Sequence, residues 1–237
     1  MKKKYHRKKS ITQIIYYYYI KRLLDIFLSI VAIIFLSPIM LGIAILVRIN
    51  LGTPIIFKQK QPKKNEKIFE MYKFRSMTNK KDKNGNLLPD ELRLTSFGKK
   101  LREISLDELP ELFNILKGDM SIVGPRPQLI HDMVFMTSKQ RKRHMVLPGL
   151  TGLAQINGRN NITWEEKFKW DLHYIQHVSF RTDIVIILRT IAKVFKRENI
   201  TTNGMETAEN LGDYLLRTNQ ITKSLYTYKL NTINIKL

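Results

Sequence analysis

One apolar stretch dominates the hydropathy of this 237-residue chain, and it runs from Leu23 to Val47 between two basic flanks. The stretch exceeds the roughly 20 residues that a helix needs to cross a bilayer. Residues 1–22 carry eight Lys or Arg and no acid, and residues 48–67 carry six against Glu66 alone. Because basic flanks favour the cytoplasmic side, the pattern favours a membrane helix with both ends on that side.

A proline, Pro38, lies inside this stretch and follows Ser37. A proline in a helix lacks one N–H donor and crowds the preceding turn, so we expect a kink there. The economical interpretation is a helix that enters the membrane, breaks at Ser37-Pro38 and returns to the same face. A single crossing fits charge and proline equally well, since spanning helices tolerate proline. A cleaved signal peptide is disfavoured, because no small-residue cleavage site follows the stretch.

Downstream of the apolar stretch, the pattern changes to short periodic segments. Two short apolar runs, 54–57 and 67–74, predict strands around a basic turn, and apolar and polar residues alternate in the second run. Residues 82–86 predict an exposed loop tip. Helical spacing of apolar residues predicts helix within 98–117 and over 164–178. The fold class is therefore α+β and mostly helical, with a short β-hairpin.

The C-terminal third contains one more periodic segment. Residues 183–195 carry apolar side chains on one side and basic ones on the other. Such a helix suits a membrane interface, although a surface helix packed on the core has the same pattern. The chain from 201 is weakly patterned, 118–127 reads as a loop rich in Gly and Pro, and 223–237 predicts a flexible terminus. The predicted organisation is a basic N-terminal extension (1–20), a membrane helix (21–50), a cytoplasmic membrane-associated domain (51–200) and a C-terminal tail (201–237).

The formal net charge of +21 calls for an anionic partner. Nucleic acid, acidic lipid headgroups and phosphorylated small molecules are the three candidates. The cations are scattered among Gly/Pro motifs without interleaved stacking aromatics, which argues against nucleic acid. The absence of cysteine excludes disulfides and thiolate metal sites. His173 and His177 lie four apart on a predicted helix, but without a third ligand they do not predict zinc.

The densest group of reactive side chains surrounds two adjacent carboxylates, Asp107 and Glu108. Pro110 fits only within a first helical turn, so helical bonding should begin near Asp107. A helix N-terminus favours phosphate, and a carboxylate there can bind Mg²⁺ or attack phosphorus. A plain helix cap is the alternative interpretation, because Ser105 and Glu108 match the S-x-x-E capping box.

Cations in restrictive segments favour chemistry over the cap. Guanidinium groups suit bidentate phosphate contact, and the prolines of Gly124-Pro125-Arg126-Pro127 fix the backbone around one of them. Asp119 could help to hold a metal. A diphosphate, Mg²⁺ and a carboxylate nucleophile together are consistent with phosphoryl transfer, although each arginine alone could form a surface ion pair. The candidate phosphate-binding residues are Lys73, Arg75, Arg102, Arg126 and Arg159.

Six motifs stand in order along the chain. They are Lys21-Arg22-Leu23-Leu24-Asp25, Ser37-Pro38, Tyr72-Lys73-Phe74-Arg75-Ser76-Met77, Ser105–Leu112, Lys117–Pro127 and Pro148–Asn160. Together they resemble those of the bacterial sugar transferases, the monotopic polyprenol phosphate phosphoglycosyl transferases that initiate glycan assembly. The resemblance runs from about Lys21 to Arg197 and fits the small form that consists of the catalytic domain alone. The segments 1–20 and after Tyr214 match no family pattern, and Leu153 stands where many relatives have Trp.

The resemblance implies a re-entrant helix broken at Ser37-Pro38, with the catalytic domain on the cytoplasmic face of the inner membrane. It also implies that Asp107, in a dyad with Glu108, attacks the β-phosphate of a UDP-sugar and releases UMP. A polyprenol phosphate, usually undecaprenyl phosphate, then takes the phosphosugar. Mg²⁺ is required, and Asp107 is expected to contact it. Arg102 and Arg126, and with them Arg159, are the positions expected to bind phosphates.

The sugar and the glycan pathway stay open. The spacing is closest to small members that use N-acetylated deoxy-amino hexoses, while UDP-galactose and UDP-glucose remain alternatives. Downstream glycosyltransferases are possible partners. A membrane-tethered nucleic-acid-binding protein and a non-catalytic scaffold on acidic lipid are the alternatives of other classes.

Overall fold

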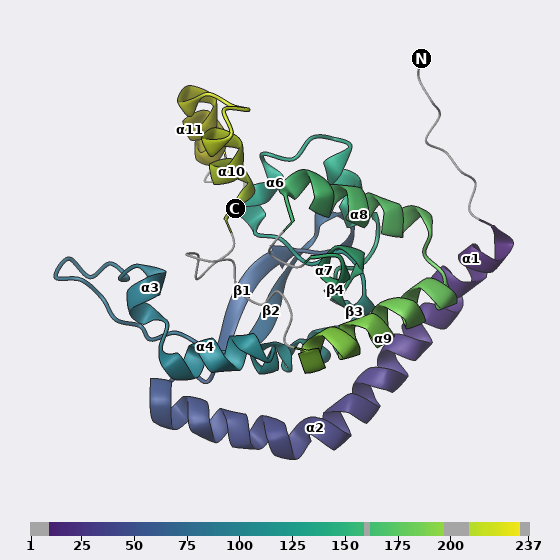
Figure 1. The fold of residues 1–237 in the computed structure, drawn as a ribbon, viewed down its shortest axis with the longest axis horizontal. Coiled ribbons are helices and arrows are strands. Elements are labelled where there is room, and N and C mark those ends of the chain that lie inside the picture. Colours follow the sequence, from purple (N-terminus) through teal and green to yellow (C-terminus); the bar gives the residue numbers. More distant parts are fainter. Residues whose placement is uncertain (1–9, 159–161, 197–208, 233–237) are drawn as a thin grey trace.

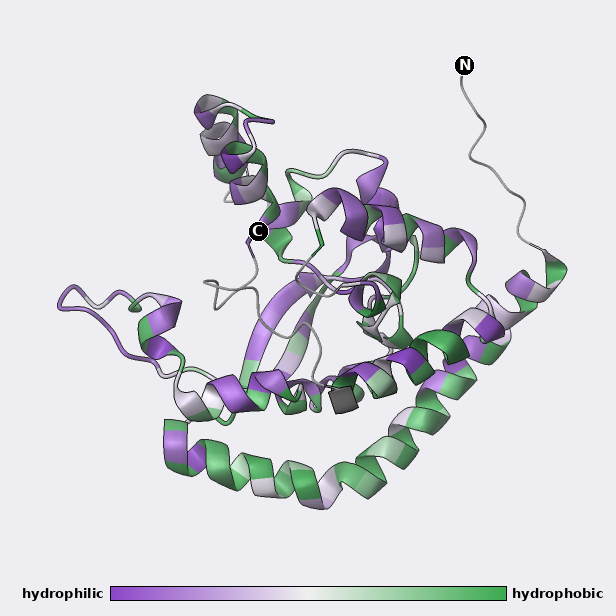
Figure 2. Cartoon of the chain, viewed as in Figure 1, coloured by the Kyte–Doolittle hydropathy of each residue, from purple (hydrophilic) through white to green (hydrophobic). Residues whose placement is uncertain are grey.

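The computed structural model describes residues 10–158, 162–196 and 209–232. Its first part is one long helix (Figure 1), in which α1 (Ile11–Ile15), a π-helical turn (Tyr16–Ile20) and α2 (Lys21–Leu51) follow without a break. Hydrophobic residues cover most of α2 (Figure 2). By length and composition, the helix over 11–51 could cross a membrane. Helix therefore begins within the segment that the sequence assigns to an N-terminal extension.

The helix α2 stays helical through Pro38, where the sequence predicts a break. Figure 1 shows a bend in the middle of α2, so that the helix curves around the underside of the domain. Pro38 offers no N–H to the carbonyl of Ile34, four residues earlier. The hydroxyl of Ser37 donates to that carbonyl instead, at 2.9 Å. The Ser-Pro pair thus produces a bend whose free backbone acceptor is satisfied, and the chain does not leave the helix.

Both ends of α2 pack against the same domain. Near its start, Asp25 and Ser29 are buried, and near its end Val47 and Leu51 are buried. Between them the outer side of the helix is exposed. The exposed apolar side chains of α2 are Leu23, Phe27, Leu28, Ile30, Ile34, Phe35, Ile39, Leu41, Ile45, Leu46 and Ile49.

A buried polar network explains the motif at the start of α2. The Lys21 ammonium lies 2.5 Å from the carboxylate of Asp183, with both side chains under a tenth exposed. The hydroxyls of Tyr16 and Tyr174 donate to the same carboxylate at 2.7 and 2.8 Å. Asp25 accepts the N–H of Ile122 at 3.0 Å. The basic and acidic residues of this apolar helix therefore attach it to the domain.

The predicted β-hairpin is present. Strand β1 (Ile56–Pro62) pairs antiparallel with β2 (Ile68–Phe74), so that Ile56 lies opposite Phe74. The second predicted strand is confirmed, whereas the first extends five residues beyond its predicted end at 57. A second, parallel pair joins β3 (Ser121–Val123) to β4 (Gly149–Thr151). The segment read as a loop over 118–127 therefore contains a strand.

Helices surround these two small sheets (Figure 1). The helix predicted over 164–178 is confirmed, and the one predicted within 98–117 is two helices separated by a 3₁₀ turn. The remaining helices are α3 (Asp90–Arg93), α4 (Ser96–Glu103), α5 (Glu111–Lys117), α6 (Ile130–Met133), α7 (Leu153–Ile156), α8 (Trp164–Gln176), α9 (Phe180–Lys196), α10 (Leu211–Arg217) and α11 (Lys223–Asn231), with 3₁₀ turns at Lys64–Glu66, Leu106–Glu108 and Gln140–Met145.

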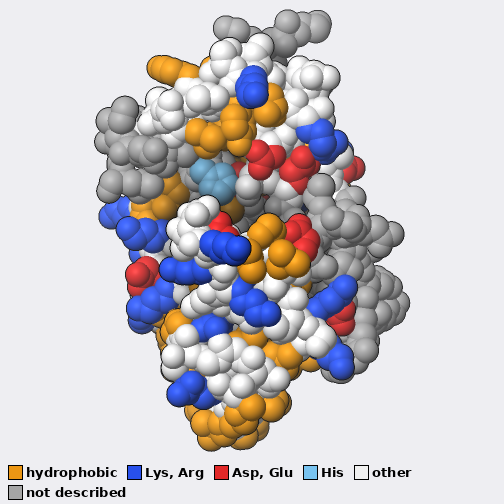
Figure 3. Space-filling view, turned by 90° about the vertical axis from the view of Figure 1, so that its left-hand side faces the viewer, with side chains coloured by type: hydrophobic (Ala, Val, Ile, Leu, Met, Phe, Trp, Pro, Cys, Tyr) orange, Lys and Arg blue, Asp and Glu red, His pale blue; other side chains and the backbone are white. Residues whose placement is uncertain are grey.

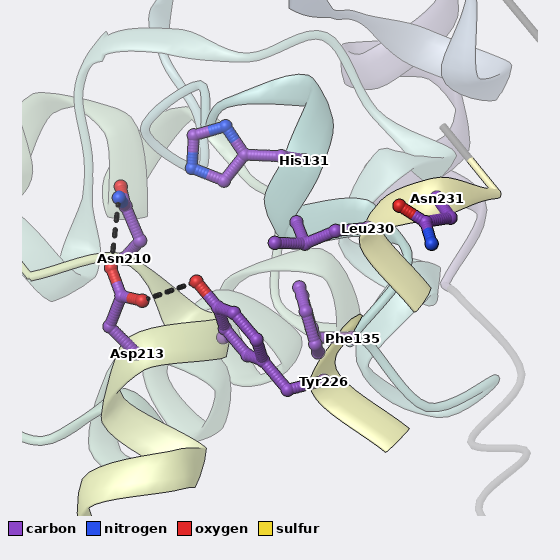
Figure 4. A pocket seen from close by; sticks show the side chains of 8 residues that line it. His131, Phe135, Asn210, Asp213, Tyr226, Leu230 and Asn231 are labelled. Carbon is purple, nitrogen blue, oxygen red and sulfur yellow. Dashed lines mark hydrogen bonds between the residues drawn. The ribbon is translucent and has the colours of Figure 1, made fainter. Parts of the chain in front are cut away.

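Part of the segment predicted as a flexible terminus (223–237) is helical, because α11 forms over Lys223–Asn231 and packs with α10 near α6; residues 233–237 lie outside the described residues. The N–H of Leu211 donates to Asp132 at 2.8 Å, and the rings of Phe135 and Tyr226 stack at 5.5 Å. A pocket of about 400 Å³ lies between these elements. Figure 4 shows the side chains that line it, among them His131. None of the predicted site residues lines this pocket. It is therefore separate from the chemistry predicted above.

The helix α9 exposes apolar side chains on one side, as its pattern predicts. Ile184, Val185, Leu188 and Ile191 are 37 to 61% exposed. An exposed apolar stripe of this kind is available to a membrane interface.

Candidate active site

The predicted dyad lies on the 3₁₀ turn Leu106–Glu108, between α4 and α5. Ser105, which precedes the turn, has a left-handed backbone (φ 57°) and makes no side-chain capping bond. The capping-box interpretation is therefore wrong. Pro110 is the N-cap of α5, so regular α-helix begins at Glu111, later than predicted.

Apolar neighbours of the dyad connect it to the membrane helix. Leu106 and Leu109, which flank the two carboxylates, pack against a core cluster that includes Val47 and Leu51 of α2. The turn that carries the dyad is thus seated on the last part of the long apolar helix.

Glu108 is held by two cations from distant parts of the chain. The Lys73 ammonium on β2 lies 2.8 Å from Glu108 Oε1. The Arg126 guanidinium, from the loop after β3, forms an ion pair with the same oxygen. The side chains of Lys73 and Glu108 are each 16% exposed, while that of Arg126 is 40% exposed. Two of the five predicted phosphate-binding residues therefore contact the dyad directly.

A third carboxylate, Glu111, completes this cluster and is missing from the sequence-based site. Its side chain is 2% exposed, and its Oε1 lies 3.2 Å from the Lys73 ammonium. Sequence spacing contained the signal, since Glu111 follows Glu108 by three residues and such pairs share a helix face. The half-buried Glu108 and the buried Glu111 thus share one lysine.

These surroundings separate the acidities of neighbouring carboxyl groups. Burial and the charge of Glu108, opposed by the nearby cations, together raise the pKa of Asp107 to about 6. Burial also acts to raise the pKa of Glu108, but the charges of Arg126 and Lys73 outweigh it and hold this pKa well below its ordinary range. Burial raises the pKa of Glu111 to about 7. At neutral pH, Glu108 is therefore ionised and Asp107 is mostly ionised, while Glu111 is present in both its protonated and its ionised form.

Arg102 on α4 faces the other member of the dyad. Its Nε donates to the Ser76 hydroxyl at 2.8 Å. Its charge acts to lower the pKa of Asp107, opposing burial. Arg102 is therefore placed to act on charge that develops at Asp107.

Two other predicted residues have different partners. The Arg75 guanidinium donates to the carbonyls of Met77 (2.9 Å), Thr53 and Leu51. These bonds fasten the end of α2 and do not fit the expected phosphate contact. Asp119 pairs with Lys63 at 2.6 Å. The last predicted cation, at position 159, lies outside the described residues.

The donor chemistry of the dyad fits Mg²⁺. Mg²⁺ commonly binds through one or two carboxylates together with substrate phosphates and waters. Across residues 10–158, 162–196 and 209–232, no cluster of three or more His, Cys, Asp or Glu forms a metal cage. A mostly ionised Asp107 beside cations that attract a diphosphate fits a Mg²⁺ ion held by a carboxylate and substrate phosphates. His173 on α8 and His177, the C-cap of that helix, stack at 4.1 Å and belong to no such cluster.

Comparison with known proteins identifies the group to which this chain is similar. The family model for "Bacterial sugar transferase" matches residues 16–197. The chain is 48% identical over 190 residues to the "Uncharacterized sugar transferase EpsL" of Bacillus subtilis (strain 168), across 80% of this chain and 94% of that protein.

Two longer relatives have names that state a reaction. The chain is 42% identical over 185 residues to the UDP-glucose:undecaprenyl-phosphate glucose-1-phosphate transferase of Klebsiella pneumoniae, across 74% of this chain and 40% of that protein. It is 35% identical over 189 residues to the UDP-N-acetylgalactosamine-undecaprenyl-phosphate N-acetylgalactosaminephosphotransferase of Aeromonas hydrophila, across 75% of this chain and 44% of that protein. The match thus spans less than half the length of these two proteins. Because the family model covers most of the described chain, the protein belongs to the bacterial sugar transferase family.

Proposed function

We propose that this protein transfers a sugar-1-phosphate from a UDP-sugar to undecaprenyl phosphate, giving a polyprenyl diphosphate sugar and UMP. The names of three relatives state transfer of this kind to undecaprenyl phosphate. The observation that carries the proposal is the charge arrangement at the dyad. A buried Asp107 stands next to Glu108 among three cations, Lys73, Arg102 and Arg126. Such a site attracts a diphosphate and offers it a carboxylate nucleophile.

The proposed reaction has two displacements at one phosphorus. A carboxylate oxygen of Asp107 bonds to the β-phosphorus, the bond from that phosphorus to the bridging oxygen breaks, and UMP leaves with this oxygen. A phosphate oxygen of undecaprenyl phosphate then bonds to the same phosphorus, and the Asp107 oxygen leaves. Neither step requires a proton, but Asp107 must attack as a carboxylate. With a pKa of about 6, Asp107 is mostly ionised at neutral pH. The guanidinium groups stabilise the charge on the phosphoryl oxygens.

A bound Mg²⁺ would neutralise phosphate charge, and Asp107 is the residue proposed to hold it. Asp119 is not included, because its carboxylate pairs with Lys63. The choice of sugar is not assigned, since the relatives named above use different sugars.

The proposed topology is a re-entrant helix. Both ends of α2 pack on one domain, and a straight crossing would place them on opposite sides of the bilayer. The outer side of α2 would then face lipid. Figure 3 shows apolar side chains gathered at the lower end of the molecule, where α2 lies, with Lys and Arg side chains above them. This order of apolar and basic side chains fits a lipid core below anionic headgroups. Because basic flanks favour the cytoplasmic side, we place the domain on the cytoplasmic face of the inner membrane, with α9 at the interface.

The test is UMP release from a panel of UDP-sugars by the full chain with Mg²⁺ and undecaprenyl phosphate. Asp107→Asn should abolish release, because the amide lacks the attacking charge. Asp90→Asn is the matched control, since Asp90 pairs with Arg93 on α3, and it should retain activity. Mass spectrometry of the wild type, quenched before lipid is added, should show a phosphosugar on Asp107. Full activity in Asp107→Asn would refute the assigned nucleophile.

A further inference from the structure

The side chain of Arg126 is more exposed than those of Lys73, Glu108 and Glu111, with which it forms a charged cluster. Its side chain is 40% exposed, against 16% for Glu108 and 2% for Glu111. It nevertheless forms an ion pair with Glu108 Oε1, which already receives the Lys73 ammonium at 2.8 Å. A cation that is open to an incoming phosphate is therefore paired with a carboxylate of the protein itself.

The main chain at Arg126 is held independently of its side chain. The Arg126 carbonyl accepts a bond of 2.7 Å from the Arg143 guanidinium. Arg143 in turn pairs with Asp171 on α8 at 2.8 Å, and each of these side chains is 3% exposed. Prolines on both sides of Arg126 restrict the backbone further. The guanidinium can therefore exchange one anion for another by side-chain rotation alone.

Glu108 does not lose its last cation when Arg126 turns away. The Lys73 ammonium remains 2.8 Å from Glu108 Oε1. Within the described residues, the only other carboxylate that pairs with Lys73 is Glu111. Burial raises the pKa of Glu111 to about 7, so Glu111 can take up a proton and leave the lysine charge to Glu108. Release of Arg126 thus leaves no unpaired buried carboxylate, and the cost of that release is kept low.

We propose that Glu108 is an internal competitor for the phosphate-binding guanidinium of Arg126, and that a substrate diphosphate binds by displacing this carboxylate. The inference rests on the function proposed above and adds a role for the second acid of the dyad. Displacement needs a ligand with more charge than one carboxylate, which favours a nucleoside diphosphate over a monoanion. When UMP departs, Glu108 returns to Arg126, so the same exchange weakens product binding.

Substitution of an active-site residue usually weakens ligand binding, whereas here it should tighten binding. If Glu108 competes with the ligand, Glu108→Gln should bind UDP with Mg²⁺ more tightly than the wild type, by about fivefold, because a neutral amide competes poorly with phosphate. Isothermal titration calorimetry of the full chain in detergent, at pH 8.5, measures the dissociation constant. Weaker or unchanged binding in Glu108→Gln would overturn the proposal.

Two controls separate competition from a general loss of negative charge. Glu111→Gln removes a carboxylate from the same cluster that contacts Lys73, and at pH 8.5 Glu111 is mostly ionised. Its effect on the dissociation constant should stay below about twofold. Against an Arg126→Met background, Glu108→Gln should give no tightening, since the shared cation is absent. Equal tightening in Glu111→Gln, or persistent tightening without Arg126, would each overturn the proposal.

UDP binding and UMP release together distinguish failure of the competition from failure of the proposed transferase reaction. Tighter UDP binding in Glu108→Gln, combined with no UMP release by the wild type from any UDP-sugar, would support the competition and refute the transferase reaction. UMP release by the wild type, combined with weaker UDP binding in Glu108→Gln, would support the reaction and refute the competition.

Discussion

Lys73 is the cation whose removal should affect this fold most clearly. It is the only cation within contact of both Glu108 and Glu111 among the described residues, and its side chain is 16% exposed. Removing one partner of a buried ion pair typically costs about 3–5 kcal/mol. Glu108 keeps Arg126, which limits the loss, so we expect Lys73→Met to destabilise the protein by about 3 kcal/mol at pH 8.5. For a chain of this size, that loss lowers the melting temperature by about 6–12 °C.

The loss should grow with pH, and Glu111 explains the direction. In the folded wild type the pKa of Glu111 is about 7, against an ordinary value of 4.5 for the unfolded chain. Between these values the folded state binds more protons than the unfolded state, so the stability of the protein falls as pH rises. The charge of Lys73 acts to lower the folded pKa, so Lys73→Met raises it further. The decline then continues above pH 7, at up to about 1.4 kcal/mol per pH unit. The difference between variant and wild type should therefore be larger at pH 8.5 than at pH 6.

The assay is thermal unfolding of both proteins in the same detergent between pH 6 and pH 9. Lys58→Met is the matched control, because Lys58 pairs with Glu70 on the exposed side of the hairpin, with side chains 57% and 49% exposed. Its cost should stay below about 1 kcal/mol at every pH. A pH-independent loss in Lys73→Met, or an equal loss in Lys58→Met, would refute the reasoning.

Two further predictions concern the backbone of the site and the membrane helix. Arg143→Met should cost about 3–5 kcal/mol of stability, because it leaves buried Asp171 without this partner. It should also raise KM for the UDP-sugar more than it lowers kcat. Arg217→Met, which removes an arginine 59% exposed in its pair with Glu209, should have neither effect. The chain has no cysteine, so single cysteines at Lys9 and Lys64 can report topology. A membrane-impermeant thiol reagent should label both only from the cytoplasmic side, and labelling from opposite sides would restore the single crossing.

Local patterns were sufficient for much of this protein. The apolar run, its proline and the basic flanks are consecutive in sequence, so they predicted the long helix and its irregularity. The helix over 164–178 and the second strand of the hairpin also followed from periodicity. The dyad and four of the five candidate cations stand in recognisable motifs that the family match now includes. These features depend on neighbours along the chain, and sequence displays such neighbours directly.

Tertiary structure decided what each charged side chain does. Arg75 and Arg126 looked equivalent as arginines in restricted segments, yet one fastens the end of α2 and the other meets Glu108. Glu111 entered the site only when β2 brought Lys73 beside it. At Ser37-Pro38 a single hydroxyl satisfies the carbonyl that the proline leaves free, so the chain stays helical where a break was predicted.

The sequence by itself determined which groups are available: a membrane-length helix, two adjacent acids and a surplus of cations. The folded chain decided which acid meets which cation and how far each is removed from water. The physical reason is that the energy of a charge depends on partners and solvent within a few ångströms, and here those partners come from segments far apart along the chain.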